Sequence, residues 1–167
     1  MTPRTARPPY VDRRIRVERL VRADPSAVFD LLTDPYRHHD IDGSGMLAGD
    51  ARGPGRLGMG DTFSMGMKLG PIPYRTRNTV VDFEEGRRIA WQTARRRRGR
   101  IVMGGQVWGY ELEPRPGGTL VRASYDWSGA VKPEWTIERT GFPERARTAL
   151  VQTLDRLAEH LEAEPSS

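Results

Sequence analysis

Hydrophobic and polar residues alternate along several segments of the chain, which is the pattern of half-buried β-strands. Residues 62–69 alternate most cleanly, because Phe63, Met65 and Met67 share one face. The same reasoning predicts strands near residues 13–21, 74–84, 88–94, 105–113 and 119–127. In the first of these, Arg19 falls on the face that is otherwise apolar. An arginine fits poorly at such a position unless that face borders something polar.

Helical patterns occupy the remaining periodic segments. Asp24 and Pro25 are typical of a helix start, and they predict a helix over residues 25–32, followed by a short helical piece at 36–41. A long helix is predicted over residues 144–162, with its leucines spaced four, three and four along one seam. This order of elements predicts an α+β fold in which a curved antiparallel β-sheet wraps a long C-terminal α-helix, with two short helices after the first strand.

The chain of 167 residues has the length of a single domain. We expect that domain at residues 13–162, between a flexible N-terminal arm (1–12) and a flexible tail (163–167). Residues 43–70 hold half of the 18 glycines, which favours loops and bent strands there.

Composition excludes several classes of protein. Without cysteine there are no disulfides, zinc ribbons or cysteine nucleophiles. No apolar run reaches the roughly 18 residues of a membrane span, and the first residues lack the apolar region of a secretory signal, so we expect a cytoplasmic protein. The net charge of +5 includes an arginine cluster at residues 95–100. No exposed aromatics or recognition helix adjoin this cluster, so we interpret it as a solvated hairpin tip and expect no nucleic-acid partner.

Three segments resemble a known superfamily: RVERLVRADPSAVFDLLTD, YRTRNTVVDFEEGRRIAWQT and WGYELEPRPGGTLVRASYDW. They resemble the START-like or SRPBCC helix-grip proteins, which include polyketide cyclases, lipid-transfer domains and Bet v 1-type allergens. More narrowly, RHHDIDGSG followed by MKLGPIPYRTRNTVVDFEE looks like small actinobacterial proteins of the polyketide cyclase/dehydrase-like type. The resemblance implies a cavity between the sheet and the long helix, where an apolar ligand binds.

The predicted inward faces are rich in aromatic residues and methionine, which suits a roomy, partly polar pocket. The alternative is a solid core that the same side chains fill, and Phe83 and Leu112 are expected to be core in either case. Arg19 is a candidate partner for a ligand carboxylate, or for a structural acid such as Asp126. The candidate cavity residues are Phe63, Met65, Met67, Trp91, Trp108, Tyr110, Tyr125, Trp127, Arg19, Asn78, His39, Leu150 and Leu154.

Other motifs fail on their context. The segment at residues 53–58 satisfies G-x-G-x-x-G, but a strand follows it where a dinucleotide site needs a helix. His38 and His39 are adjacent, so on a helix their side chains diverge by about 100° and do not suit one metal ion. Residues 42–46 do not form a G-x-S-x-G motif. We therefore expect no metal and no cofactor.

The leading hypothesis is a protein that binds a small hydrophobic or aromatic ligand, lipid-like or polyketide-like, in this cavity. One alternative is a cofactor-independent enzyme of the polyketide cyclase or dehydratase type. A second is a protein-interaction module with a closed cavity. Residues 129–143 are expected to form either a flap over the cavity or a partner-binding surface, and of the two we predict a flap that gates entry. The sequence leaves open whether the chain forms a homodimer.

Overall fold

The computed structural model describes residues 12–163. The predicted arm and tail therefore lie outside the described residues, apart from Asp12 and Ala163. The elements, in chain order, are β1 (Arg14–Val21), α1 (Pro25–Leu32), the 3₁₀ turn η1 (Pro35–Arg37), α2 (His38–Ile41), β2 (Leu47–Arg52), β3 (Thr62–Leu69), β4 (Ile72–Glu84), β5 (Arg88–Arg97), β6 (Arg100–Arg115), β7 (Gly118–Asp126), α3 (Pro133–Thr136), the 3₁₀ turn η2 (Glu138–Thr140) and α4 (Phe142–Glu162).

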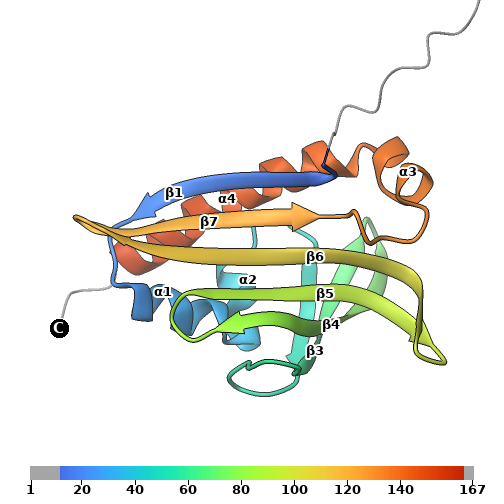
Figure 1. Cartoon of the computed structure of the whole chain (residues 1–167), viewed down its shortest axis with the longest axis horizontal. Helices are drawn as coiled ribbons and strands as arrows, with labels where there is room; N and C mark the ends of the chain where they lie inside the picture. Colours follow the sequence, from blue (N-terminus) through green and yellow to red (C-terminus); the bar gives the residue numbers. More distant parts are fainter. Residues whose placement is uncertain (1–11, 164–167) are drawn as a thin grey trace, which may run out of the picture.

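The described strands form one seven-stranded antiparallel sheet in the order β1-β7-β6-β5-β4-β3-β2. Neighbours in sequence are mostly neighbours in the sheet, as tight hairpins require. The exception is β1, which pairs with β7 along its whole length. The sheet curves, and α4 packs on β1 and β7 (Figure 1). The predicted α+β helix-grip fold is confirmed.

The long helix forms as its leucine spacing predicts. Leu150, Leu154, Leu157 and Leu161 are all buried on the side that faces the sheet. The helix begins at Phe142, two residues before the predicted start, because Pro143 fits the first helical turn, where no backbone N–H is needed. Gly141 precedes it with a φ of 73°, a conformation that glycine adopts without strain.

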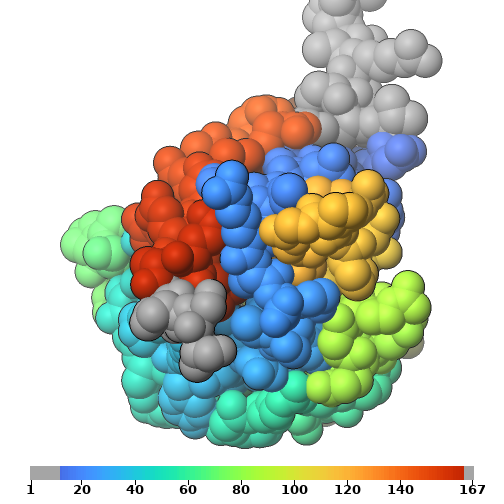
Figure 2. Space-filling model, turned by 90° about the vertical axis from the view of Figure 1, so that its left-hand side faces the viewer, coloured from blue at the N-terminus to red at the C-terminus, as the bar shows by residue number. Residues whose placement is uncertain are grey.

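The hydrophobic core is densest where α1 packs against the sheet. Val28, Leu31 and Leu32 are completely buried there. Phe29 contacts Phe83 with ring centroids 5.6 Å apart. Figure 2 looks onto this end, where the C-terminal part of α4, the β1–α1 connection and the β6–β7 turn lie against one another. Phe83 and Leu112 belong to this core, as predicted, and neither lines the cavity between the sheet and α4.

The glycine-rich segment contains a strand, β2, that the sequence did not predict. A Cβ atom on Gly66 would lie 2.6 Å from the Cα of Gly49 on the neighbouring strand, closer than packing allows. The two glycines let β2 and β3 approach closely. Because Gly49 has no side chain, the alternation that marks the other strands is weak in β2.

The arginine cluster occupies the tip of the β5–β6 hairpin, as predicted. Arg97 pairs with Arg100 across a two-residue turn. The turn residues Arg98 and Gly99 both have positive φ, at 50° and 77°, which is the type I′ geometry that matches strand twist. β5 and β6 are therefore several residues longer than their predicted limits.

Candidate ligand cavity

A cavity of about 1090 Å³ lies between the sheet and α4. Strands β3 to β7 form one wall, and α2, the loop after it and the first half of α4 form the other. The lining includes Leu69 and Tyr74, which are 60% and 40% exposed, so the cavity opens to solvent at the β3–β4 turn. Ligand pockets typically span about 300–1,000 Å³, so this one has room for a fused-ring or lipid-like molecule.

One aromatic cluster lies on the wall next to α2. His38 stacks on Trp91 with ring centroids 5.1 Å apart. Phe63 meets Trp91 edge to face at 5.5 Å, and the tilted ring of Tyr110 lies 5.7 Å from that of Trp91. These contacts hold the rings in fixed orientations, so this part of the wall offers a preformed apolar surface.

A second aromatic cluster lies below the start of α4. Trp108 and Tyr125 come from paired positions on β6 and β7, with ring centroids 4.4 Å apart. Phe142, the first residue of α4, packs against Tyr125 at 5.5 Å. The cavity is therefore bounded by two aromatic clusters, and the methionines of β3, Met65 and Met67, also line it.

A short row of polar side chains crosses the same wall. The Oδ1 atom of Asn78 accepts a hydrogen bond of 2.6 Å from the hydroxyl of Thr93. Its Nδ2 atom donates to the hydroxyl of Thr76 at 3.4 Å. All three residues line the cavity, so an inward strand position that is usually apolar here carries a satisfied polar network.

Two other polar atoms of the lining have no hydrogen-bond partner within residues 12–163. They are the hydroxyl of Tyr125 and Oε1 of Gln106. Both atoms are buried, and leaving such groups unpaired costs free energy. They are the two places on this wall where a bound polar group would relieve an unfavourable state of the empty protein.

The buried part of the sheet wall carries no charged side chain, whereas the half-buried carboxylate of Asp42 lines the opposite wall and accepts hydrogen bonds from the backbone N–H groups of Ser44 and Leu47. Burial lowers the pKa of His38, and its Nε2 atom donates a hydrogen bond of 2.9 Å to the carbonyl of Leu32, so the imidazole is neutral. Burial raises the pKa of Tyr110 and of Tyr125, so both phenols remain protonated. The exposed charged side chains of the lining, such as Lys68 and Arg145, lie at the mouth.

Most of the predicted cavity residues line this one cavity: Phe63, Met65, Met67, Asn78, Trp91, Trp108, Tyr110, Tyr125 and Leu150. Four others lie elsewhere. The completely buried Trp127 lies behind Tyr125, and its indole N–H donates a hydrogen bond of 3.0 Å to Glu138. Leu154 lies one turn beyond Leu150 on α4, at the contact with β1. Exposed His39 pairs with Asp40.

Arg19 is the fourth, and its environment explains its awkward place on an apolar strand face. The strand packs against α4, and Arg19 forms an ion pair with Asp155 of that helix. Asp126, the acid suggested from sequence, instead pairs with Arg14 at 2.7 Å. Arg19 therefore ties β1 to α4 and does not face the cavity.

Several lining residues were not predicted from the sequence, among them Gln106, His38 and Phe142. Gln106 lies two and four residues before Trp108 and Tyr110, so strict alternation along β6 would have found it. His38 shares a face of α2 with Ile41, three residues on, but the sequence prediction names its exposed neighbour His39 as the cavity residue. Phe142 lies before the predicted helix start, and no periodic signal marked it as inward-facing.

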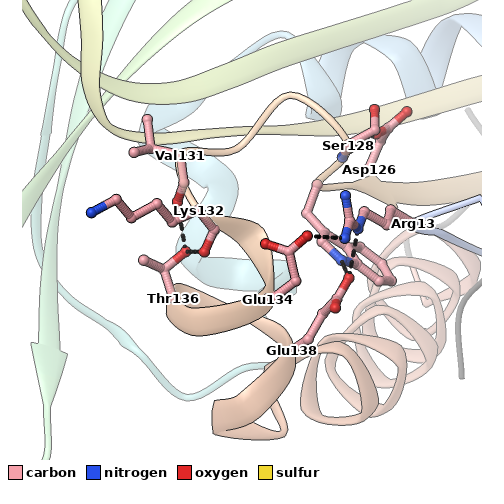
Figure 3. A network of polar contacts seen from close by, with 9 residues as sticks. Arg13, Asp126, Ser128, Val131, Lys132, Glu134, Thr136 and Glu138 are labelled. Atoms are coloured by element: carbon pink, nitrogen blue, oxygen red, sulfur yellow. Dashed lines mark hydrogen bonds and ion pairs between the residues drawn. The ribbon is translucent and has the colours of Figure 1, made fainter. Parts of the chain in front are cut away.

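The segment between β7 and α4 covers one side of the cavity, to which it contributes Thr136 and Ile137. Polar contacts fasten it (Figure 3). Arg13 donates to Glu138 at 2.7 Å and to Glu134 at 2.5 Å. At the other end of the segment, the backbone N–H of Val131 donates to the carbonyl of Gly104 at 2.9 Å.

The described part of the chain offers little for metal chemistry. Within residues 12–163 no three His, Asp or Glu side chains gather as metal ligands would. None of its helices is long and apolar enough to cross a membrane. The chemistry available on the cavity wall is that of a neutral imidazole, two protonated phenols, an amide network and a large apolar surface.

The curved sheet, the gripped C-terminal helix and the cavity between them define a helix-grip protein of the Bet v 1-like type. The family model described as polyketide cyclase / dehydrase and lipid transport matches residues 12–162. The chain belongs to this family.

Similar proteins agree with this assignment. The chain is 32% identical over 150 residues to uncharacterized protein Rv0088 of Mycobacterium tuberculosis; the match covers 86% of this chain and 63% of that protein. The chain thus spans less than two thirds of the length of this curated relative. Protein NE0264 of Nitrosomonas europaea has a similar structure (TM-score 0.69, 16% identity, 92% of this chain and 96% of that one). Major latex-like protein 151 of Panax ginseng is another (TM-score 0.66, 11% identity, 89% and 96%).

Proposed function

We propose that the protein binds one small, uncharged and mostly apolar molecule, aromatic or lipid-like, in the cavity between the sheet and α4. The observation that carries this proposal is a cavity of about 1090 Å³ with two aromatic clusters and no charged side chain on the buried part of its sheet wall. Burial of apolar ligand surface contributes about 25 cal/mol per Å², so each 100 Å² adds roughly 2.5 kcal/mol of gross binding free energy.

The polar end of the ligand is proposed to lie near Tyr125 and Gln106. Their unpaired atoms are covered in the empty protein, so a small rotation of neighbouring side chains accompanies binding. The phenol donates and the amide oxygen accepts, so a ligand hydroxyl or carbonyl suits this position better than a carboxylate. A carboxylate would also lose its hydration without gaining a positive partner.

A second candidate function is a cofactor-independent cyclase or dehydratase. The description of the family includes such enzymes, and the neutral His38 and the protonated Tyr110 flank the same Trp91. An unprotonated imidazole nitrogen can accept a proton and a phenol can donate one, which is what closure and dehydration of a ketide chain require. A closed-cavity interaction module is the less favoured alternative, since the cavity is large.

Access to the cavity is proposed to involve residues 129–143. This segment contributes Thr136, Ile137 and Phe142 to the lining, and it is fastened mainly through Glu138. Loosening of these few polar contacts would uncover the side of the cavity without breaking the sheet. A cytoplasmic location stays a prediction.

The test is native mass spectrometry of the purified protein, followed by denaturing extraction and thermal-shift assays with fatty acids, flavonoids and polyketide aromatics. We expect a discrete mass excess that disappears on denaturation, or a stabilising compound in the panel. Ala146→Phe places a ring in the cavity from α4 and should abolish either signal. Val151→Phe, on the exposed face of the same helix, is the matched control.

Three outcomes separate the candidates. An apo mass with no thermal shift from any compound would contradict ligand binding. Turnover of a bound ketide that is lost in His38→Gln with binding retained would favour the enzyme. Binding by wild type and His38→Gln without turnover would favour a carrier.

A further inference from the structure

The mouth of the cavity lies where the sheet splits. The β4–β5 ladder ends at the pair Asn78↔Thr93, and beyond it β4 continues with β3 while β5 continues with β6. The two hairpins diverge from this point, and residues on both of them line the cavity. With α3, they make up the right-hand end of the molecule in Figure 1, opposite the densely packed end of Figure 2.

This end exposes large apolar side chains. Leu69 and Ile72, at the β3–β4 turn, are 60% and 63% exposed. Met103, near the start of β6, is 62% exposed, and Trp135 on α3 is 63% exposed. Single exposed apolar residues are common on protein surfaces, but a set gathered at one end around the opening of an apolar cavity marks an interaction site.

The same end carries positive charge that the protein does not neutralise. Arg95, Arg97, Arg98 and Arg100 are exposed, and none of them forms an ion pair within residues 12–163. Arginines elsewhere on the surface mostly do pair, as Arg122 does with Glu113 at 2.8 Å. Within residues 12–163, the β5–β6 hairpin tip therefore holds a dense group of arginines that no ion pair neutralises.

We propose that this end docks on an anionic lipid bilayer, with the hairpin tip held at the headgroups and the apolar rim in contact with the acyl boundary. Basic residues near an anionic membrane attract it electrostatically, and exposed apolar side chains add a second, salt-resistant contribution. Docking in this orientation turns the mouth toward the lipid. An apolar ligand then enters or leaves without crossing water.

The composition of the rim favours lipid over nucleic acid as the partner. Proteins that bind single strands use aromatic platforms on which bases stack, interleaved with the basic residues. Here the exposed apolar side chains that follow the arginines on β6 are Val102 and Met103, which offer no stacking surface. The guanidinium of Arg139 lies over one face of the Trp135 ring, 3.7 Å from its centroid, so a base could not stack on that face.

The test is co-sedimentation of the whole chain with vesicles of phosphatidylcholine, alone or with one third phosphatidylglycerol. We expect binding only to the anionic vesicles, and weaker binding at high salt. In Arg97→Gln/Arg98→Gln the affinity should fall about 25-fold, since each basic residue near the surface contributes about fivefold. Leu69→Ser/Ile72→Ser should lose the binding that persists at high salt.

The matched control removes two charges at the opposite end, in Arg22→Gln/Arg115→Gln, and should change the affinity less than threefold. Equal losses in both arginine variants would mean attraction by net charge alone and would overturn the proposal. Absence of wild-type binding to anionic vesicles would also overturn it. The proposal would also be overturned if a short single-stranded RNA competed for the protein more strongly than the vesicles do, because nucleic acid would then be the partner. None of these outcomes depends on the ligand in the cavity.

Discussion

The unpaired hydroxyl of Tyr125 gives an unusual expectation for a core substitution. The residue is completely buried, and its hydroxyl finds no partner within residues 12–163. Tyr125→Phe removes only that oxygen and keeps the ring contacts with Trp108, Trp127 and Phe142. An unpaired buried hydroxyl costs about 1–3 kcal/mol, against which the variant loses a few dispersion contacts.

The net expectation is therefore a gain of about 1 kcal/mol in the free energy of unfolding of the empty protein. For a chain of this size that corresponds to a rise in Tm of about 2–4 °C. Differential scanning calorimetry and urea unfolding, both on ligand-free protein, measure the change. Most core substitutions shift Tm in the opposite direction, so the sign alone is informative.

Tyr36→Phe is the matched control. Its hydroxyl donates a hydrogen bond of 2.7 Å to the carbonyl of Gly53, so its loss should lower Tm. If Tyr125→Phe lowers Tm as much as Tyr36→Phe does, the hydroxyl of Tyr125 is satisfied in the empty protein. The reasoning that assigns it to a ligand would then be refuted.

Three further substitutions test the site and the sheet. Burial holds the pKa of His38 below its unfolded value of 6.5, so the unfolded chain takes up the proton first and stability should fall as pH drops below about 6.5. Tm measured from pH 7.5 to 5 should show this fall, and the fall should be smaller in His38→Asn. Glu138→Gln should speed amide hydrogen exchange across residues 129–143, whereas Glu134→Gln, at a more exposed carboxylate, should change the exchange rate less. If this segment of the wild type is as well protected from exchange as the central strands, a gating role is contradicted. Gly66→Val should separate β2 from β3 and lower Tm by several degrees, with loss of exchange protection in β2 alone as the local signature.

Much of the fold follows from side-chain periodicity. The strand at Thr62–Leu69 and the helix at Pro25–Leu32 have the predicted limits, because apolar spacing and flanking turn residues agree in both places. β2 is the exception for a physical reason. Its pairing with β3 depends on the absence of side chains at two facing glycines, and a pattern of side chains cannot report that.

The cavity wall was partly predictable for the same reason. Alternation places Phe63, Trp91 and Trp108 on inward faces, and these residues do line the cavity. Alternation does not say where along the sheet the cavity gives way to solid packing. Trp127 obeys the same alternation as Tyr125, yet Glu138 from a later segment caps its indole and removes it from the lining. The position of Arg19 on an apolar strand face is likewise explained by its ion pair with Asp155, which is distant in the sequence.

The pairing of β1 with β7 has a consequence for how the chain folds. Arg14 faces Asp126 across this ladder, 112 residues later in the sequence. Until β7 has been synthesised, β1 has no strand to pair with, and the apolar residues that it buries against α4 remain exposed for longer still. Contacts of such long range slow folding to the millisecond-to-second range in small domains. β1 is thus the last strand to join the sheet, and its apolar face is the part of the nascent chain most in need of protection from aggregation.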